Sequence, residues 1–479
     1  MIIYLFSDGL QPGAPAAASR MSYETAITRM FALGHELAHT PSNKFDLAHM
    51  RVLLAALDHP ERRFPAVLIA GTNGKGSTAA TLASILRASG LRTGRYTSPH
   101  LVRINERICI NGEPIPDDDF ALLHDVVDRT AERLVSEGEL PWHPSFFETL
   151  TAMAFEYFWR QKVEIAVLEV GMGGRLDATN VVEPRVAVIT DISLDHQKFL
   201  GNTVTEIARE KAGIIRPRGI VVTLPQHPEA NDVIGNTILE LGATAVSAVA
   251  YVPPLSPASG NYFIPNEQFL TAEGRKARTQ LIARYPLQIQ GSEILVETPL
   301  IGRHQLRNVA LAIAAAEELS KQGFGVTAAS LERGIRETRW PGRFQIIPAG
   351  DGAPELVLDV AHNPDGAWAL RSTLSAVYED RRMFMVFGAM RDKAIAEIAE
   401  ILFPLPQSVI VTRADNPRSA TTDEIGEAAA RSSAEIEATP DVASALSRAR
   451  ALAAPDGLVV VTGSIYIVGE AFRALGVRI

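Results

Sequence analysis

Short runs of consecutive apolar residues alternate along the chain with longer stretches whose apolar residues recur every three or four positions. Continuous runs of this length are typical of strands buried on both faces of a sheet, and the wider spacing is typical of helices. The predicted strands are at 64–71, 163–171, 185–193 and 219–224, and the predicted helices are at 77–90, 146–161 and 304–319. This alternation predicts a parallel sheet with helices on both faces, which is an α/β fold.

The pattern changes twice further along the chain. Between about 250 and 300, a turn-rich segment is followed by alternating residues, which predicts a small β insertion built on a hairpin. Pro341 and Gly342 then interrupt any regular element, and apolar runs and helical stretches resume beyond them. A chain of 479 residues is too long for one ordinary core. We therefore expect a first domain at 21–335, a linker at 336–343 and a smaller Rossmann-like α/β domain at 344–479.

Composition narrows the class of protein. Hydrophobic residues make up 47% and charged residues 21%, the balance of a soluble globular protein. The net charge of -9 argues against a nucleic-acid partner, although local basic groups can still bind an anionic substrate. No apolar run approaches the ~20 residues of a membrane span, so we expect no membrane partner. The single cysteine, Cys109, cannot form an internal disulfide, which fits a reducing compartment, and we expect a cytoplasmic protein.

The first twenty residues differ from the rest. They start apolar without a basic segment and continue as a Pro/Ala-rich stretch, and helical spacing begins only after Met21. We expect residues 1–20 to be a disordered extension or the product of a start codon placed too early. A signal peptide is the alternative, and N-terminal sequencing of the native protein distinguishes them.

The strongest local motif is a glycine-rich loop between a predicted buried strand and a predicted helix. Glycines let several backbone N–H groups converge on phosphate oxygens, the helix dipole favours negative charge, and Lys75 adds a positive charge. The match to the general phosphate-loop pattern is imperfect, because no glycine lies five residues before Gly74 and a glycine follows Lys75. Strand, loop, lysine and helix are nevertheless in order, so we expect ATP phosphates to bind. The predicted loop residues are Gly71, Thr72, Asn73, Gly74, Lys75, Gly76, Ser77 and Thr78.

An ordered set of motifs resembles a known family across about residues 22 to 475. The loop AGTNGKGST is similar to that of the folate branch of the Mur ligase superfamily; the cell-wall branch usually has Thr directly after the lysine, so Gly76 favours the folate branch. The chain resembles folylpolyglutamate synthase and the bifunctional dihydrofolate synthase. The further motifs are YTSPHLVRINERI (96–108), LEVGMGGRLDATN (168–180), LDHQKFLG (194–201), REKAGI (209–214), GRHQLRNVALA (302–312), RWPGR (339–343), LDVAHNP (358–364) and VTGSIYIVGE (461–470).

The resemblance implies a Mur-ligase-like fold and an ATP-dependent ligase. It would add L-glutamate to dihydropteroate, to folates through γ-linkage, or to both, by way of an acyl phosphate, and bacterial members of this length are often bifunctional. ATP and two Mg²⁺ ions are the implied cofactors. The implied partners are a folate or dihydropteroate acceptor and L-glutamate, and we expect a monomer.

The resemblance also implies metal-binding residues. Ser98 and Glu169 would hold the Mg²⁺ that accompanies ATP, and Glu169 and His196 would bind a second Mg²⁺. Lys211 resembles the lysine that family members carry as a carbamate. Oxygen ligands with an occasional imidazole suit Mg²⁺. Taken alone, Glu169 is a capping or pairing carboxylate, His196 a structural histidine and Lys211 a helix residue that pairs with Glu206 or Glu210.

The remaining implied residues belong to the nucleotide and the acceptor. Asn308, Arg343 and Asp359 match positions that hold the nucleotide, and His362 beside them is a catalytic candidate with Lys75 and Lys211. The acceptor candidates are Asp46, Ser145 and Phe147, in segments near the pterin site by resemblance, and Arg107, a candidate anion contact. For Arg107, a solvated surface charge is the alternative.

Two positions depart from the family pattern. Gln197 stands where Thr is usual, beside the candidate ligand His196, and Val360 stands where Gly is usual. If the turn at Val360 requires a positive φ, this β-branched residue is strained.

Three other functions stay open. They are a Mur-type ligase with a different acceptor, a non-catalytic ATP-binding protein that retains the fold, and a simple phosphate-loop kinase or ATPase. Gly76 argues against the first, the presence of Lys75, Glu169 and His196 against the second, and the second domain against the third.

Overall fold

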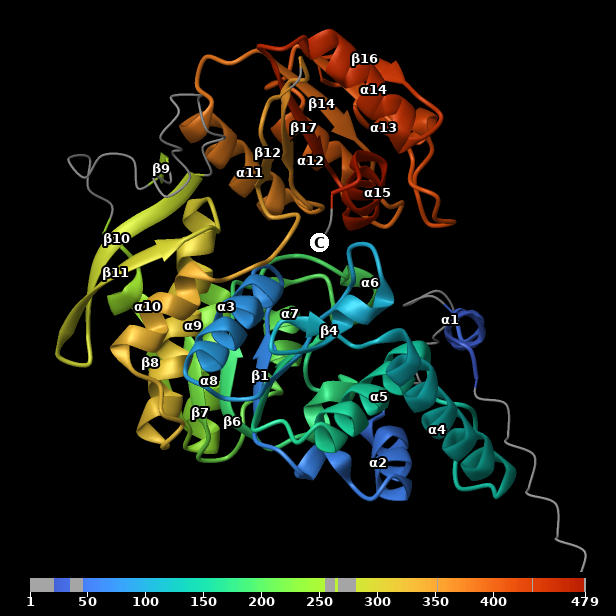
Figure 1. The fold of residues 1–479 in the computed structure, drawn as a ribbon, viewed down its shortest axis with the longest axis vertical. Helices are drawn as coiled ribbons and strands as arrows, with labels where there is room; N and C mark the ends of the chain where they lie inside the picture. Colours follow the sequence, from blue (N-terminus) through green and yellow to red (C-terminus); the bar gives the residue numbers. More distant parts are fainter. Residues whose placement is uncertain are drawn as a thin grey trace, which may run out of the picture.

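The computed structural model describes residues 21–34, 46–254, 263–265, 281–350, 352–432 and 434–477. The chain forms two open sheets, each with helices on both faces, and the unit that carries residues 345–475 lies above the other unit in Figure 1. The expected extension at 1–20 lies outside the described residues. Among the helices of the described part, none is long and apolar enough to cross a bilayer.

The larger sheet has eight strands in the order β4-β3-β2-β5-β1-β6-β7-β8. From β2 to β8 all neighbours are parallel, and β3 and β4 extend the sheet in antiparallel fashion. The predicted parallel α/β sheet is therefore confirmed. Its strands are β1 (Ala66–Ala70), β2 (Thr93–Tyr96), β3 (Ile108–Ile110), β4 (Glu113–Pro114), β5 (Ile165–Glu169), β6 (Pro184–Ile189), β7 (Ile220–Thr223) and β8 (Thr244–Ser247).

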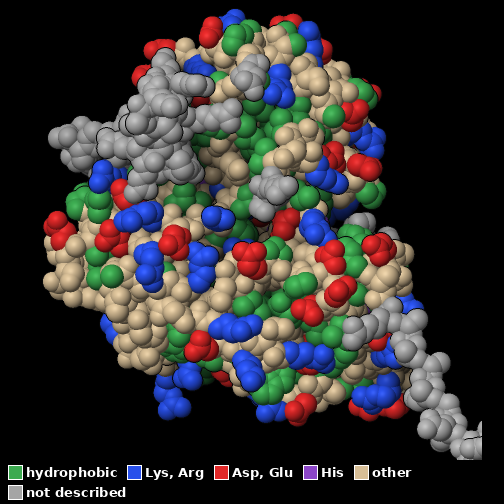
Figure 2. Space-filling view, in the orientation of Figure 1, with side chains coloured by type: hydrophobic (Ala, Val, Ile, Leu, Met, Phe, Trp, Pro, Cys, Tyr) green, Lys and Arg blue, Asp and Glu red, His purple; other side chains and the backbone are tan. Residues whose placement is uncertain are grey.

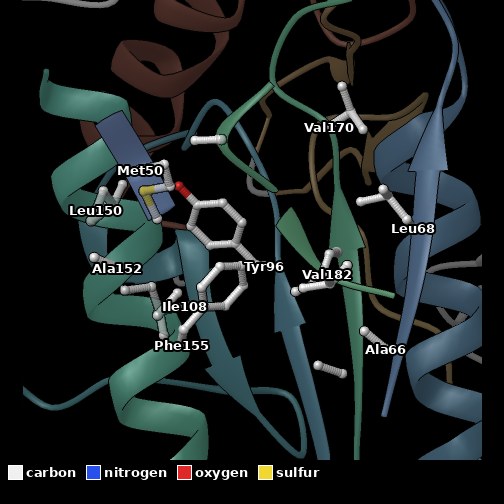
Figure 3. Packing of buried hydrophobic residues seen from close by; sticks show 14 of the residues in the cluster. Met50, Ala66, Leu68, Tyr96, Ile108, Leu150, Ala152, Phe155, Val170 and Val182 are labelled. Carbon is white, nitrogen blue, oxygen red and sulfur yellow. The ribbon is translucent and has the colours of Figure 1, made fainter. Parts of the chain in front are cut away.

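Two cores cover this sheet because successive side chains of a strand point to opposite faces. Leu68 of β1 packs in a cluster with residues of α2, α4 and α5, part of which Figure 3 shows. Ile69 packs on the other face, against α3, α9 and α10. The helices of this unit are α1 (Tyr23–Ala32), α2 (Leu47–Ala56), α3 (Lys75–Ala88), α4 (Asp117–Ser136), α5 (Phe146–Arg160), α6 (Gln197–Leu200), α7 (Val204–Ala212), α8 (Pro228–Leu241), α9 (Arg303–Lys321) and α10 (Ala328–Arg336).

The predicted β insertion is a three-stranded antiparallel sheet in the order β11-β10-β9. Its strands are β9 (Phe263–Pro265), β10 (Leu281–Ile289) and β11 (Ser292–Thr298). β11 packs against α10, so the insertion covers the α9–α10 side of the larger unit (Figure 1).

The second sheet has six strands in the order β12-β13-β17-β14-β15-β16, all parallel except β12. Helices α11, α12 and α13 cover one face, and α14 and α15 cover the other. Its elements are β12 (Gln345–Ile347), β13 (Glu355–Leu358), α11 (Pro364–Val377), β14 (Met383–Phe387), α12 (Ile395–Leu402), β15 (Ser408–Val411), α13 (Thr422–Ala428), β16 (Glu435–Ala438), α14 (Val442–Ala453), β17 (Leu458–Thr462) and α15 (Ile465–Leu475).

The helix after the phosphate loop differs from its predicted bounds of 77–90. It begins at Lys75 because Gly74, with φ 91°, turns the backbone directly into the first helical turn. It ends at Ala88, and Gly90 follows with φ 87°, as a glycine past a helix end commonly does. The earlier start places Lys75 and Gly76 in the first turn of α3.

Candidate active site

A cavity of about 1500 Å³ lies between the two units and is lined by residues from both. Single small-molecule pockets occupy roughly 300–1,000 Å³, so this one has room for more than one substrate. Polar side chains reach it from the carboxyl ends of β1, β5, β6, β13 and β14, where open α/β sheets place their ligands.

The phosphate loop is held by contacts with the segment after β6. Thr72 N–H donates to the Asp191 carbonyl at 2.8 Å, and Ser193 N–H donates to Thr72 Oγ1 at 3.1 Å. Only glycine fits at position 74 for two reasons. Its φ of 91° is rarely adopted by residues with a side chain, and a Cβ there would lie 2.1 Å from Asn308 Oδ1. Lys75 Nζ donates to the Thr72 carbonyl at 3.2 Å. The loop is thus preformed, with its lysine folded back over the turn.

Gly76 lies against Trp340 of the segment that joins the two units. A Cβ at position 76 would lie 2.5 Å from Trp340 Cζ2. The Trp340 ring is contacted by the guanidinium carbons of Arg95 at 4.9 Å and Arg343 at 5.7 Å from its centroid. A side chain after the loop lysine is therefore excluded here by a residue from the connection between the units.

Gly76→Ala is expected to raise the KM for ATP about tenfold, because overpacking costs about 1–3 kcal/mol and the strain falls on the loop. The measurement is KM for ATP with the other substrates saturating. Gly235→Ala is the matched control, since Gly235 is also helical and a Cβ there meets nothing within 4 Å. An unchanged KM in Gly76→Ala would contradict the steric reading.

Glu169, the last residue of β5, is 4% exposed and lines the cavity. Its Oε2 accepts a hydrogen bond from Ser98 N–H at 3.1 Å. Burial raises the pKa of this carboxyl, while nearby Lys75 opposes the shift. No direct ion pair to Glu169 occurs among the described residues. A buried carboxylate that faces a cavity without a contacting cation is suited to a metal ion.

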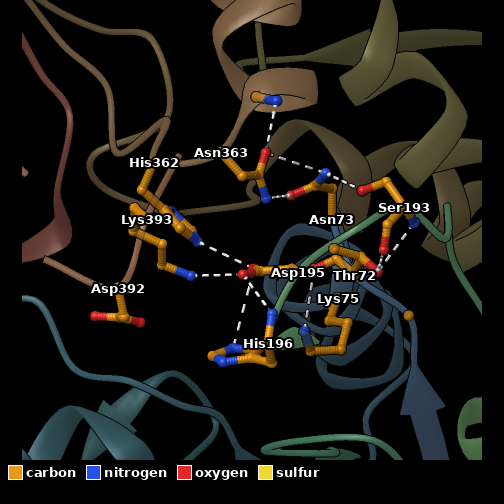
Figure 4. Close-up of polar contacts among 12 residues, drawn as sticks. Thr72, Asn73, Lys75, Ser193, Asp195, His196, His362, Asn363, Asp392 and Lys393 are labelled. Carbon is orange, nitrogen blue, oxygen red and sulfur yellow. Dashed lines mark hydrogen bonds and ion pairs between the residues drawn. The ribbon is translucent and has the colours of Figure 1, made fainter. Parts of the chain in front are cut away.

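A cluster of four side chains joins the two units beside the loop (Figure 4). Asp195 Oδ1 accepts from Lys393 Nζ at 2.6 Å, and the Nε2 atoms of His196 and His362 each lie 3.9 Å from Asp195 Oδ2. Asp195 and His196 follow β6, whereas His362 and Lys393 belong to the second unit.

Charge within this cluster is set by burial. Burial lowers the pKa of both His196 and His362 to about 4, so both imidazoles are neutral at pH 7. Burial on its own would raise the pKa of Asp195, but His196, Lys393 and His362 together hold it well below its usual range. The ion pair between Asp195 and Lys393 is therefore a charged contact between the units.

A second contact between the units is neutral. Asn363 Nδ2 donates to Asn73 Oδ1 at 2.9 Å, and Asn363 Oδ1 accepts from Gly366 N–H at 2.8 Å as the cap of α11. Asn73 Nδ2 also lies 3.3 Å from Ser193 Oγ (Figure 4). The start of α11 is thereby fixed opposite the phosphate loop.

Lys393→Met is expected to lower kcat about 100-fold while leaving ATP binding in place. Breaking a buried ion pair costs about 3 kcal/mol, which depopulates the arrangement in which both walls of the cavity meet. Steady-state kinetics and nucleotide titration measure the two effects. Arg391→Met is the matched control, because Arg391 is exposed and pairs with Glu424 at 3.2 Å. Equal kcat values in the two variants would show that Lys393 does not contribute to turnover.

Lys211 is buried and donates from Nζ to the Gly71 carbonyl at 2.7 Å. Burial, assisted by Lys75, lowers the pKa of its amine to about 7. The alternative that Lys211 pairs with Glu206 or Glu210 is wrong. Glu210 pairs with Arg175 at 2.9 Å, and Glu206 caps the start of α7 through Thr203.

The nucleotide candidates approach the loop from two directions. Asn308 of α9 accepts from Thr78 Oγ1 through its carbonyl at 3.4 Å, and Asp359 accepts from Phe344 N–H at 2.8 Å. Burial lowers the pKa of Arg343 and raises that of Asp359. Val360 lies outside the set of residues with positive φ, so the conditional strain at this departure is absent.

Most of the predicted site residues line this one cavity, and two do not. Arg107 is 2% exposed and donates from Nε to His100 Nδ1 at 2.9 Å, so it is neither a solvated surface charge nor a lining residue. Thr78 lies one turn into α3, behind the loop. The predicted residues that line the cavity are Asp46, Gly71, Thr72, Asn73, Gly74, Lys75, Gly76, Ser77, Ser98, Ser145, Phe147, Glu169, His196, Lys211, Asn308, Arg343, Asp359 and His362.

Three contacts in the cavity were not predicted from the sequence. They are the ion pair of Lys393 with Asp195, the hydrogen bond of Asn363 with Asn73 and the packing of Trp340 against Gly76. Lys393 lies in the loop after β14 of the second unit, and this position after a strand end was the available signal.

Comparisons with known proteins agree with this architecture. The Mur ligase middle domain matches residues 122–316, and the glutamate ligase domain of Mur ligases matches residues 342–465. A Bacillus subtilis protein named dihydrofolate synthase/folylpolyglutamate synthase is 34% identical over 90% of this chain and 94% of its own length.

Solved structures agree as well. A Mycobacterium tuberculosis folylpolyglutamate synthase complexed with ADP and AMPPCP has a TM-score of 0.79 and 30% identity, covering 95% of this chain and 99% of that one. A structure described as an FPGS–AMPPCP–folate complex has a TM-score of 0.76 and 30% identity over 95% of this chain and 100% of its own. Two matching domains and relatives matched over nearly their whole length place this chain in the dihydrofolate synthase/folylpolyglutamate synthase family of Mur ligases.

Proposed function

We propose that this protein is an ATP-dependent ligase that joins L-glutamate to dihydropteroate, to folates, or to both. The observation that carries the proposal is the cavity between the units. Its lower wall holds the phosphate loop and Glu169, and its upper wall holds His362 and Lys393. The relatives, whose names state these activities, cover almost the whole chain.

The reaction needs two steps that this cavity can house together. A carboxylate oxygen of the acceptor attacks the terminal phosphorus of ATP, ADP leaves, and an acyl phosphate forms. The neutral amine nitrogen of glutamate then attacks the acyl carbon, phosphate leaves, and the nitrogen loses one proton to solvent, so that the amide keeps one N–H. Lys75 and the N–H groups of the loop stabilise charge on the phosphate, and closure of the units excludes water.

We propose that Mg²⁺ accompanies ATP here. The donor chemistry fits, because Mg²⁺ is usually held by one or two carboxylates together with substrate phosphates and waters. Glu169, with Ser98 and His196, which also line the cavity, would hold it, and it would offset charge between carboxylate and triphosphate. Within the described residues no set of three or more His, Cys, Asp and Glu side chains is arranged to hold a metal by itself, which agrees with a site completed by the nucleotide.

We propose that Lys211 carries a carbamate. Carbon dioxide adds to a neutral amine, and an amine with a pKa of about 7 is neutral in a large fraction of molecules at pH 7–8. As the N–C bond forms, the nitrogen loses one proton to solvent, and the carbamate product is an anion that would reverse the local charge beside Lys75. Native mass spectrometry under mild conditions is expected to show a mass increase of one carbon dioxide that Lys211→Met lacks. Full activity of a protein shown to carry unmodified Lys211 would refute this.

We also propose that the enzyme is monomeric, cytoplasmic and without a nucleic-acid partner. The net charge is -9, and acidic and basic side chains are interspersed on the face shown in Figure 2. Sedimentation velocity tests the first point, and a dimer would overturn it.

The decisive assay gives the purified protein ATP, Mg²⁺ and L-glutamate with dihydropteroate or tetrahydrofolate in separate reactions. Acceptor-dependent release of ADP and a product heavier by one glutamate residue are expected with at least one acceptor. No release above background with either would refute the folate assignment, and a panel of cell-wall and poly-glutamate acceptors then tests another Mur-type ligase.

A further inference from the structure

One wall of the cavity carries an exposed tryptophan, Trp142. Trp142 lies in the segment between α4 and α5 and lines the cavity with Met50 of α2 and Phe147 of α5. Its side chain is 40% exposed although it lines a concave surface. The indole therefore has surface available to a bound molecule.

The indole is held by a histidine from α2. The rings of His49 and Trp142 have centroids 5.2 Å apart at an interplanar angle of 31°. His49 is itself buried, and its Nδ1 lies 3.7 Å from Glu148 Oε1. Glu148 is fixed in turn, because its Oε2 accepts from Ser145 N–H at 2.8 Å in the capping box of α5. The ring orientation of Trp142 is thus tied to the start of a core helix.

The neighbouring residue anchors the same segment to α4. His143 Nε2 lies 3.1 Å from Asp128 Oδ1, and Asp128 Oδ2 accepts from Arg29 Nη1 at 2.9 Å. The hydrogen bond that His143 donates to Asp128, opposed by burial, raises the pKa of His143. A segment held by His143 and by the ring contact of Trp142 with His49 presents the indole at small entropic cost, which is what a preorganised contact requires.

The position of Trp142 decides which substrate it meets. Helices α2 and α5 cover one face of the large sheet, while α9, which carries the nucleotide candidate Asn308, covers the other (Figure 1). L-Glutamate has no ring, and ATP is expected at the phosphate loop and the α9 side. The planar ring system of the acceptor remains as the partner whose chemistry suits an exposed indole.

We propose that Trp142 is a specificity-determining residue whose indole stacks on the planar ring of the acceptor. This inference rests on the proposed function and adds a residue to its acceptor subsite. Removal of one aromatic side chain that stacks on a heteroaromatic ring typically lowers affinity about tenfold.

The test compares Trp142→Ala and Trp142→Phe with Trp368→Ala, which removes a tryptophan that is 56% exposed on α11 and does not line the cavity. Trp142→Ala is expected to raise the KM for dihydropteroate or tetrahydrofolate about tenfold. The KM for ATP and for glutamate stays the same, and Trp142→Phe recovers most of the loss. Trp368→Ala behaves as the wild type.

A binding measurement separates stacking from a structural role. Titration of wild-type protein with the acceptor alone is expected to quench tryptophan fluorescence, and the Trp142→Phe protein loses most of that quench while its melting temperature stays within a few degrees. An acceptor KM unchanged in Trp142→Ala, or KM values for all three substrates raised together, would overturn the inference. Failure of the wild-type enzyme to ligate glutamate to any folate acceptor would instead refute the proposed function.

Discussion

Lys75→Ala is expected to abolish measurable turnover, with kcat lowered by roughly 10³-fold or more. Phosphoryl transfer depends on charge stabilisation, and removal of one preorganised donor typically costs 10²–10³-fold, with larger losses where a full positive charge contacts the phosphate. Lys75 is the lysine of the phosphate loop, and its Nζ donates to the Thr72 carbonyl at 3.2 Å. The measurement is ADP release under saturating substrates.

Two controls make this result specific. Lys321→Ala removes an exposed lysine that pairs with Glu318 at 2.6 Å on α9, and it should leave kcat unchanged. The melting temperature of Lys75→Ala should match that of the wild type, because Lys75 makes no ion pair within the described part of the chain. Turnover within tenfold of the wild type would mean that the phosphate contact has been misassigned.

Glu169→Ala is the second large effect, with an expected loss of about 10²–10³-fold in kcat and no unfolding. The carboxylate is buried, and burial raises its pKa, so the charged form is a liability to the folded state. Its removal therefore costs the fold little while removing the group proposed to hold Mg²⁺. ADP release over a series of Mg²⁺ concentrations is the measurement, and retained activity would exclude Glu169 as a metal ligand.

The same residue predicts a pH dependence of stability. A carboxyl whose pKa is raised by folding stabilises the protein most below the unfolded value of 4.5, and the contribution is lost as pH rises through the folded pKa. In metal-free buffer, the melting temperature of Glu169→Gln minus that of the wild type should increase as pH rises above 4.5. Exposed Glu337, paired with Arg87 at 2.9 Å, provides the control Glu337→Gln, for which no such divergence is expected.

The sequence predicted the sheet and the phosphate loop because both are local. Five consecutive apolar residues predict a buried strand such as β1. The position of Gly74 and Lys75 between this strand and the next helix predicts the phosphate loop. Where the α3 helix begins was not predictable, since a glycine in the left-handed region can either end a turn or start a helix. The motifs then supplied the family, and the comparisons confirmed it.

The contacts between the units could not be predicted in the same way. Asp195 and Lys393 are 198 positions apart, and Asn73 and Asn363 are 290 apart. Each residue taken alone is an ordinary polar side chain in a loop, and only the packing of two separate sheets brings the partners together. Trp340 was visible as part of RWPGR, but its contact with Gly76 depends on how the connection crosses the phosphate loop.

The two contacts between the units, Asn73 with Asn363 and Asp195 with Lys393, also bear on how much ATP is hydrolysed without amide formation. Asn73 of the phosphate loop and Asp195 beside it reach their partners only when the upper unit is docked. In the proposed reaction, a molecule with its units apart would keep Lys75 but lack the wall formed by Asn363 and Lys393, so its site would be incomplete for phosphoryl transfer. Transfer would then be confined to the docked state, in which the acyl phosphate is shielded from water. ATP would then be hydrolysed to ADP mainly in molecules in which the glutamate amine can react with the acyl phosphate.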